Sequence, residues 1–226
     1  MASPAPGLTP HHRFTTPADG DLAVASDGVA GRRAAIVDLP WTWLQQVHGG
    51  RVVTVREPGA HAGAPADAAV TAVANTVVAV QAADCAPVVL LAHGVVGVAH
   101  AGWRGLVAGV LPAAVDAMRD LGARDIAAVL GPCVQPCCYE FGEEELRQVE
   151  VATGAPVRRL TTSGTPALDV PAAVAGALAA VGVPLDTGPS VCTSCASPPL
   201  WSHRARAEPQ RQAALAWLTA GQERSA

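Results

Sequence analysis

Residues 83–105 read ADCAPVVLLAHGVVGVAHAGWRG, two apolar runs separated by His93-Gly94. A residue followed by glycine between β-branched runs is typical of a tight hairpin turn. We therefore predict a hairpin with strands over 88–92 and 95–99. The apolar runs give way to polar, glycine-flanked residues, which is where proteins usually build binding and catalytic sites.

The register of this hairpin brings a thiol close to an imidazole. If Ala92 faces Val95, Cys85 faces Gly102 and lies diagonal to His100 on the same face. Diagonal neighbours are roughly 7–8 Å apart at the backbone, which is within reach of side chains. The pair suits a Cys–His nucleophile and base, or two ligands of one metal ion. The competing interpretation is that both side chains are ordinary core residues.

Composition excludes several classes of protein. The 226 residues suffice for one good-sized domain, and the hydrophobic half of them is mostly Ala and Val, which favours short strands and thin helices. A net charge of −4 without a basic stripe argues against nucleic-acid binding. No apolar run reaches the roughly 18 residues of a membrane span, and the N-terminus lacks a signal-peptide pattern. We therefore expect a cytoplasmic protein without a membrane partner, whose six cysteines are reduced thiols or metal ligands.

Strands dominate the first half of the chain and helices are spread through the second. Further strands are predicted over 13–16, 41–48, 51–56, 68–71, 76–81 and 126–130. Helices are predicted over 30–37, 104–121, 143–153, 168–181 and 210–220, with Pro112 kinking or restarting the second. The Pro-rich segment 1–12 is expected to be flexible, and 13–226 to form a single domain of mixed α/β type. The sequence leaves the oligomeric state open.

A second histidine is a further candidate for the site. His48 ends a predicted strand in Gln46-Val-His-Gly, although spacing alone does not bring it to Cys85, and a surface-loop histidine is the alternative. If it converges with Cys85 and His100, the three side chains supply one thiolate and two imidazoles. Three protein ligands with an open water position are the pattern of catalytic zinc, which lowers the pKa of its water to about 7.

Arg104 follows His100 at a predicted helix start. Exposed amides there, together with a guanidinium, make an anion site, whereas the ordinary alternative is a surface salt bridge in the first helical turn.

The other cysteines form a rival constellation. Cys133, Cys137 and Cys138 are followed by Cys192-Thr-Ser-Cys195. The separation between Cys138 and Cys192 is far beyond zinc-ribbon spacings, so buried thiols in tight turns are favoured over a structural zinc site.

Several motifs together resemble the YfiH/laccase-domain family, also known as YfiH-like purine nucleoside phosphorylases, peptidoglycan editing factors or multicopper polyphenol oxidoreductases. The motifs are Gln46-Val-His-Gly, Asp67-Ala-Ala-Val-Thr, Ala83-Asp-Cys-Ala-Pro-Val, Ala99-His-Ala-Gly-Trp-Arg-Gly, Leu130-Gly-Pro-Cys-Val-Gln-Pro-Cys-Cys-Tyr-Glu and Cys192-Thr-Ser-Cys. The match runs from about Arg13 to Leu218, and the ordered set is specific although each motif alone is weak.

The resemblance implies a fold and a site. The fold is a four-layer α-β-β-α sandwich with two mixed β-sheets, shared with toxin-type cysteine hydrolases. The implied centre is formed by His48, Cys85 and His100 as catalytic and zinc-binding residues, with Gln46 and Arg104 binding substrate or phosphate. Copper chemistry is not supported, because no His-x-His pairs are present.

The resemblance also implies alternative activities. Phosphorolysis of a purine nucleoside would bind phosphate at Arg104, and deamination of adenosine would use a zinc-activated water. Amide cleavage in a cell-wall precursor would use Cys85 as nucleophile and His100 as base, so metal and covalent roles compete for the same thiol. We expect a nucleoside and phosphate as ligands, with the amidase and a non-catalytic binding module as alternatives.

Two segments depart from the family pattern. A Gly-rich, Asn-containing segment after the first strand is reduced to Asp19-Gly-Asp-Leu, and a terminal Arg-Arg-Asp-Gly…Gly-Arg appears as Ser202-His-Arg-Ala-Arg-Ala-Glu followed by Gln210-Arg211. The two altered segments, 19–26 and 202–211, are expected to border the pocket and to affect substrate specificity or activity.

Overall fold

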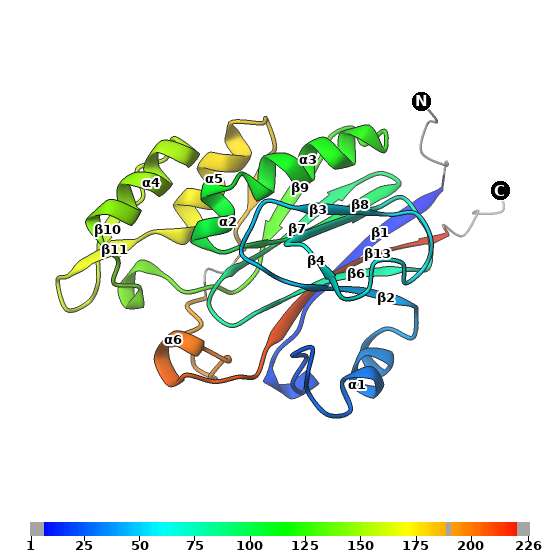
Figure 1. The fold of residues 1–226 in the computed structure, drawn as a ribbon, viewed down its shortest axis with the longest axis horizontal. Coiled ribbons are helices and arrows are strands. Elements are labelled where there is room, and N and C mark those ends of the chain that lie inside the picture. The colour runs from blue at the N-terminus through cyan, green and yellow to red at the C-terminus, as the bar shows by residue number, and fades with distance from the viewer. Residues whose placement is uncertain (1–6, 189–190, 221–226) are drawn as a thin grey trace.

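Two mixed β-sheets are stacked face to face in the computed structural model, which describes residues 7–188 and 191–220 (Figure 1). The five-stranded sheet has the order β1 (Leu8–Phe14), β13 (Gln212–Ala220), β6 (Val77–Ala82), β2 (Trp41–Gln45) and β4 (Ala64–Pro65). The six-stranded sheet has the order β12 (Leu185–Asp186), β9 (Ala127–Leu130), β7 (Ala86–Ala92), β8 (Val95–Ala101), β5 (Ala68–Thr71) and β3 (Val52–Val55). Each sheet contains both parallel and antiparallel pairs.

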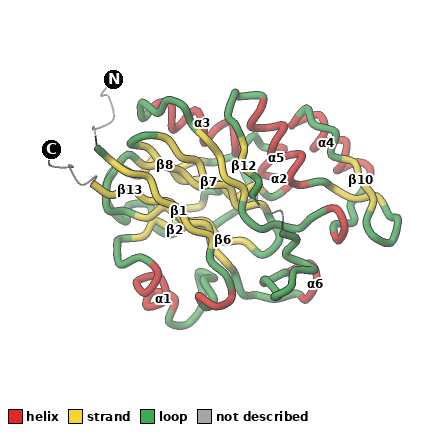
Figure 2. The backbone as a smooth tube through the Cα atoms, turned by 180° about the vertical axis from the view of Figure 1, so that it is seen from behind, coloured by secondary structure: helices red, strands yellow, loops and turns green. Residues whose placement is uncertain are grey.

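Helices cover the outer face of each sheet. The six-stranded sheet packs against α2 (Trp103–Val107), α3 (Val110–Asp120) and α5 (Val170–Ala179), and α4 (Glu143–Thr153) packs on α2 and α5. The five-stranded sheet packs against α1 (Val29–Ile36), which lies on the opposite side of the molecule (Figure 2). Shorter elements are α6 (His203–Arg206), the 3-10 helices η1 (Pro17–Asp19) and η2 (Pro136–Cys138), and the ribbon β10 (Arg158–Leu160) and β11 (Pro166–Leu168). The predicted four-layer α-β-β-α architecture is confirmed.

The apolar runs of the sequence are explained by burial on both faces of the inner strands. Along β6, Val78 and Val80 join the core between the sheets, whereas Val77 and Ala79 join the core under α1. Successive residues of a strand point to opposite faces, so a strand covered on both sides is apolar throughout.

The central hairpin has the predicted register. In β7 and β8, Ala92 pairs with Val95 and Pro87 pairs with His100. Continuing this register by two residues places Cys85 opposite Gly102, as the turn chemistry of His93-Gly94 implies.

The prediction of a closing helix over 210–220 is wrong, because Gln212–Ala220 forms strand β13. The segment is rich in Ala and Leu, which favour helices. It lies between β1 and β6, and residues 212–216 are all buried, so pairing on both edges overrides local propensity.

The flexible segment predicted over 1–12 is also too long. Residues 8–12 belong to β1 and pair with β13, from Leu8 opposite Ala220 to His12 opposite Ala216. The part of this prediction that falls on residues 1–6 lies outside the described residues.

The predicted helix over 104–121 is divided in two. Gly109 adopts a left-handed conformation between α2 and α3, and Pro112 lies in the first turn of α3, where proline is tolerated. In the part of the chain that the structure describes, no helix combines the length and apolarity needed to cross a bilayer.

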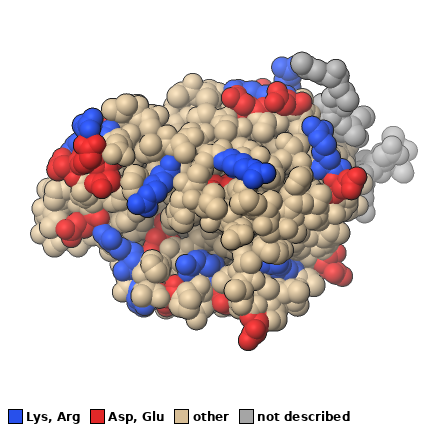
Figure 3. Space-filling view, viewed as in Figure 1, with Lys and Arg blue, Asp and Glu red and all other residues tan. Residues whose placement is uncertain are grey.

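Charged side chains of both signs are interspersed on the face shown in Figure 3. Some form exposed pairs within or beside a helix, such as Arg147 with Glu144 and Arg158 with Glu150. Such pairs contribute little stability individually, so the layered apolar core holds the fold together.

Gly131 is a test of the contact between the sheets. A Cβ at this position would lie 2.4 Å from Phe14 of β1 and 2.9 Å from Pro87 of β7. We expect Gly131→Ala to destabilise the protein by about 1–3 kcal/mol through overpacking. Gly31→Ala, in α1 with open space around it, is the matched control and should be neutral or stabilising. Equal thermal unfolding midpoints for the two variants would contradict this packing.

Candidate functional site

The three residues predicted to form the site lie at one end of the stacked sheets. His48 is in the turn after β2, Cys85 connects β6 of one sheet to β7 of the other, and His100 is near the end of β8. The site is therefore assembled where the chain crosses between the sheets. The register of the hairpin brings Cys85 to His100, whereas His48 arrives from the five-stranded sheet.

The donor atoms of these residues are close enough to share one ligand. Cys85 Sγ is 4.0 Å from His48 Nε2, and one donor atom from each residue lies within 4.8 Å of the others. The rings of His48 and His100 are 4.8 Å apart between centroids and nearly perpendicular, at 76°. The structure thus brings together the thiol and both imidazoles, and their catalytic role stays a prediction.

A buried carboxylate holds both histidines. Asp67, with no exposed surface, accepts a 2.9 Å hydrogen bond from His100 Nδ1. It also accepts from the backbone amides of Val47, His48 and Gly49, at 3.2, 2.9 and 2.7 Å. Because Nδ1 of His100 donates to Asp67, Nε2 is free to face the thiol or a metal ion.

A second carboxylate positions the backbone beside Cys85. Asp84 accepts from the hydroxyls of Thr193 and Ser202, at 2.6 and 2.7 Å, and from the amide of Arg204 at 2.6 Å. Its φ of 103° lies in the left-handed region that non-glycine residues rarely adopt. The hydrogen bonds from Thr193, Ser202 and Arg204 stabilise this strained backbone conformation of Asp84. Strained residues of this kind are common at functional sites.

Gly102 leaves the space that the three side chains occupy. A Cβ there would lie 3.1 Å from Cys85 Sγ, 3.1 Å from His48 Cδ2 and 3.7 Å from His100 Cε1. Any larger residue would crowd the donor atoms, so glycine is required by the close approach.

The electrostatics of the group favour a thiolate next to an imidazolium. Burial alone raises the pKa of Cys85, but the imidazoles of His100 and His48 lower it from 9.0 to about 6. Burial alone lowers the pKa of His100, but Asp67 and the Cys85 sulfur raise it from 6.5 to about 9. Burial likewise raises the pKa of Asp67, yet its hydrogen bonds from His100 and Gly49 bring the net pKa below 3.8.

The group lines a cavity of about 830 Å³. This volume is in the range of about 300–1,000 Å³ typical of small-molecule sites. Trp43 supplies an aromatic ring to the wall and is backed by the buried Arg33, whose guanidinium carbon is 4.9 Å from the centre of that ring. Residues 23–25 together with His203, Pro209 and Arg211 complete the wall, so both segments that depart from the family pattern border the pocket as expected.

The two predicted substrate-binding residues are placed differently. Gln46 lines the cavity, but its carboxamide is engaged with the backbone of Gln81, donating to its oxygen and accepting from its nitrogen at 2.7 Å each. Arg104 is exposed, with its guanidinium 4.3 Å from the Trp103 ring centre, and is not among the residues lining the cavity. Arg211 is the arginine on the cavity wall.

The cysteine arrangement differs from the expectation of separate buried thiols. Cys137, Cys138, Cys192 and Cys195 lie together with their sulfur atoms within 4.8 Å of one another. Cys133, which has no exposed surface, is outside this group.

Sequence reasoning missed the supporting residues Asp67, Asp84 and Gly102. Asp67 and Asp84 had a usable signal, because each is a carboxylate adjoining an apolar strand and therefore needs partners when buried. Arg211 was expected only to border the pocket, as part of a segment that departs from the family pattern, and it lies on the cavity wall just before β13.

This chain is similar in sequence to a described protein family and to named bacterial proteins. A family model described as multi-copper polyphenol oxidoreductase laccase matches residues 18–219. The purine nucleoside phosphorylase ORF3 of Streptomyces griseus is 46% identical over 196 residues, which cover 84% of this chain and 78% of that protein. A purine nucleoside phosphorylase of Streptomyces coelicolor is 42% identical over 207 residues, which cover 89% and 81%.

Solved structures confirm the fold. The hypothetical protein YfiH of Bacillus licheniformis matches with a TM-score of 0.79 at 23% identity, covering 94% of this chain and 97% of that one. YlmD from Geobacillus stearothermophilus matches with a TM-score of 0.77 at 26% identity, covering 96% and 94%.

The ionisation of Cys85 can be measured directly. In metal-free protein, we expect the rate of its reaction with iodoacetamide to rise with a midpoint near pH 6, because the thiolate is the reactive form. His100→Ala should move this midpoint upward towards 9.0, since it removes the imidazolium that stabilises the thiolate. Peptide mapping separates Cys85 from Cys133, a buried control whose pKa is raised by burial. A wild-type midpoint that His100→Ala leaves in place would contradict the ion pair.

Proposed function

This chain belongs to the family described as multi-copper polyphenol oxidoreductase laccase, and on that premise we propose that it is an enzyme acting on purine nucleosides. The expected reactions are phosphorolysis of inosine or adenosine and deamination of adenosine. The names of the Streptomyces relatives support the substrate class. The observation that carries the proposal is the convergence of His48, Cys85 and His100 on the wall of a cavity whose volume is typical of small-molecule sites.

The donor set fits a zinc ion. His48, Cys85 and His100 would hold it through two imidazole nitrogens and one thiolate, which is a ligand combination that suits zinc. His100 already donates its Nδ1 hydrogen to Asp67, the outer contact that zinc-binding histidines usually have. When bound, zinc supplies Lewis acidity and activates water near neutral pH, which is the chemistry that deamination needs.

The cavity residues orient the substrate. Trp43 offers a ring against which a purine can stack, and the Gln46 carboxamide, held by the Gln81 backbone, lines the same cavity. Arg211 would neutralise a phosphate. Its Nη1 donates to the carbonyls of Glu208 and Gln210, and the remaining N–H groups of the guanidinium are the donors for oxyanion oxygens. His203 is on the same wall and is the candidate to move a proton to or from the purine.

A second candidate function is cysteine-dependent amide hydrolysis in a cell-wall precursor. The observation that favours it is the order Asp67, His100, Cys85, which matches an orienting carboxylate, a base and a nucleophile. The lowered pKa of Cys85 makes the thiol reactive at neutral pH. A thiolate that holds zinc is a poor nucleophile, so the two functions make opposite demands on this residue.

Turnover separates these candidates. We expect purified protein to convert adenosine with phosphate into free purine and ribose phosphate, or into inosine, and Cys85→Ala to lose at least 100-fold in kcat/KM. Chelation should abolish turnover and zinc should restore it, whereas bound zinc should protect Cys85 from alkylation. Product formation in Cys85→Ala at the wild-type rate would refute the site. Activity on an amide substrate that survives chelation but not alkylation would favour the hydrolase instead.

The phosphate contact is tested by a pair of arginine variants. We expect Arg211→Ala to raise the KM for phosphate about tenfold or more, and Arg211→Lys to recover only part of the loss, because an ammonium cannot bind oxyanions bidentately. Arg104→Ala is the matched control, since Arg104 packs on Trp103 outside the cavity wall. If Arg104→Ala raised the KM for phosphate and Arg211→Ala did not, the helix start after His100 would be the phosphate site.

A further inference from the structure

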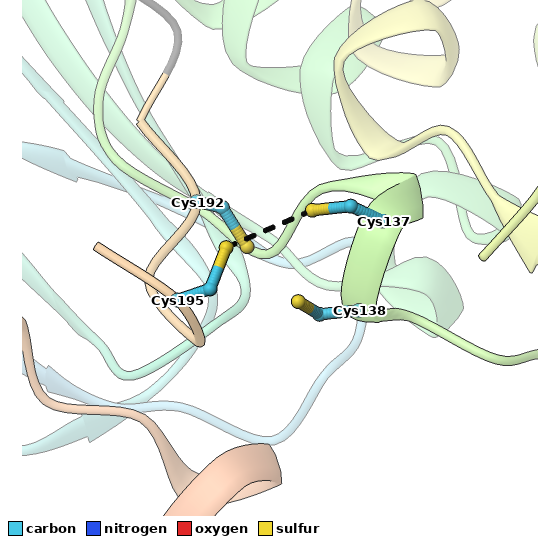
Figure 4. A group of neighbouring side chains, drawn as sticks. All are labelled: Cys137, Cys138, Cys192 and Cys195. Atoms are coloured by element: carbon cyan, nitrogen blue, oxygen red, sulfur yellow. Dashed lines mark hydrogen bonds between the residues drawn. The ribbon is translucent and has the colours of Figure 1, made fainter. Parts of the chain in front are cut away.

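Four cysteines from two distant segments face one another away from the cavity. Cys137 and Cys138 belong to η2, and Cys192 and Cys195 belong to the segment that follows residue 190. Figure 4 shows the four side chains turned inward from the two sides, with their sulfur atoms around a common centre. All four sulfur atoms lie within 4.8 Å of one another.

The spacing of the sulfur atoms matches coordination better than covalent bonding. Cys137 Sγ and Cys195 Sγ are 3.8 Å apart. A disulfide would require about 2.0 Å. A tetrahedron of thiolates around zinc, with zinc–sulfur bonds of about 2.3 Å, has edges of about 3.8 Å.

The backbone around Cys192 is shaped for a thiolate. The amide of Gln135 donates to Cys192 Sγ at 3.4 Å. A backbone amide that donates to sulfur stabilises the negative charge of a thiolate. This contact is independent of the spacing of the sulfur atoms.

The two segments are aligned by backbone pairing next to the cluster. Cys133 and Cys192 form a parallel bridge, and Thr193 donates its amide to the Cys133 carbonyl at 3.2 Å. The Cys133 side chain points elsewhere and accepts from Gln135 Nε2 at 3.6 Å. The pairing therefore delivers Cys192 and Cys195 to the two cysteines of η2 and leaves Cys133 out.

We propose that Cys137, Cys138, Cys192 and Cys195 bind a structural zinc ion, separate from the His48–Cys85–His100 group and independent of the reaction catalysed there. Four thiolates fill the coordination sphere, which is the pattern of structural rather than catalytic zinc. Its role is to fasten the segment that carries Thr193 and Ser202, whose hydroxyls hold Asp84 beside Cys85. Binding converts the coordinating thiols to thiolates and releases their protons to solvent.

The metal content of paired variants tests this proposal. In a His48→Ala, Cys85→Ala background, which removes two donors of the other group, we expect about one zinc per chain by elemental analysis after purification with zinc and a reductant. Adding Cys138→Ala and Cys195→Ala, one from each segment, should remove this zinc. Cys133→Ala in the same background is the matched control and should retain it.

Two results would overturn the proposal. One is a His48→Ala, Cys85→Ala protein that contains no zinc. The other is a zinc content that stays unchanged after Cys138 and Cys195 are also replaced. If the variants do not fold, cobalt substitution of the wild-type chain decides the question. We expect thiolate-to-cobalt charge-transfer absorption several times stronger than one thiolate can give. Absorption equivalent to a single thiolate, or a Cys137–Cys195 disulfide found by mass spectrometry in protein kept reduced, would refute the site.

Discussion

The buried carboxylate of Asp67 is the contact on which the site depends. A charged group without exposed surface is tolerated only if donors surround it, and Asp67 has four, three from the turn of His48 and one from His100. These bonds tie a turn of the five-stranded sheet to two strands of the six-stranded sheet. The same bonds set which nitrogen of His100 faces the thiol. Fold and chemistry are therefore joined at one side chain, and replacing it would leave three amides and an imidazole without their acceptor.

The charges around Cys85 suit two roles, a cysteine nucleophile and a metal ligand. The thiolate is stabilised by the neighbouring imidazoles, and the proton that stays on His100 up to about pH 9 is itself stabilised by Asp67 and the thiolate. A thiolate beside an imidazolium is the ionisation state that a cysteine nucleophile requires. A metal ion needs the same His100 nitrogen without its proton, so metal and proton compete, and metal affinity rises with pH.

The sequence predicts the parts of the structure that depend on local chemistry. The hairpin of β7 and β8 follows from the His93-Gly94 turn, and its register alone brings Cys85 to His100. The closing strand β13 is missed because Ala-rich segments favour helix unless neighbours pair with both edges. The family resemblance, rather than spacing, predicts that His48 joins the site. The sequence names the cysteines of the cluster but favours separate buried thiols, because the two halves are brought together by a bridge between Cys133 and Cys192 that no spacing rule encodes.

The two segments that depart from the family pattern, 19–26 and 202–211, are hydrogen-bonded to each other and together form one wall of the cavity. Asp21 accepts from the amide of Arg211 at 2.9 Å, and Leu22 donates to the carbonyl of Arg211 at 2.9 Å. Residues 23–25 and Arg211 then line the same cavity. A change in either segment shifts the other, because the hydrogen bonds are made by backbone groups whose positions follow the chain. The shortened segment near the N-terminus and the altered one near the C-terminus are therefore a single modification of the cavity wall, separate from the group of His48, Cys85 and His100.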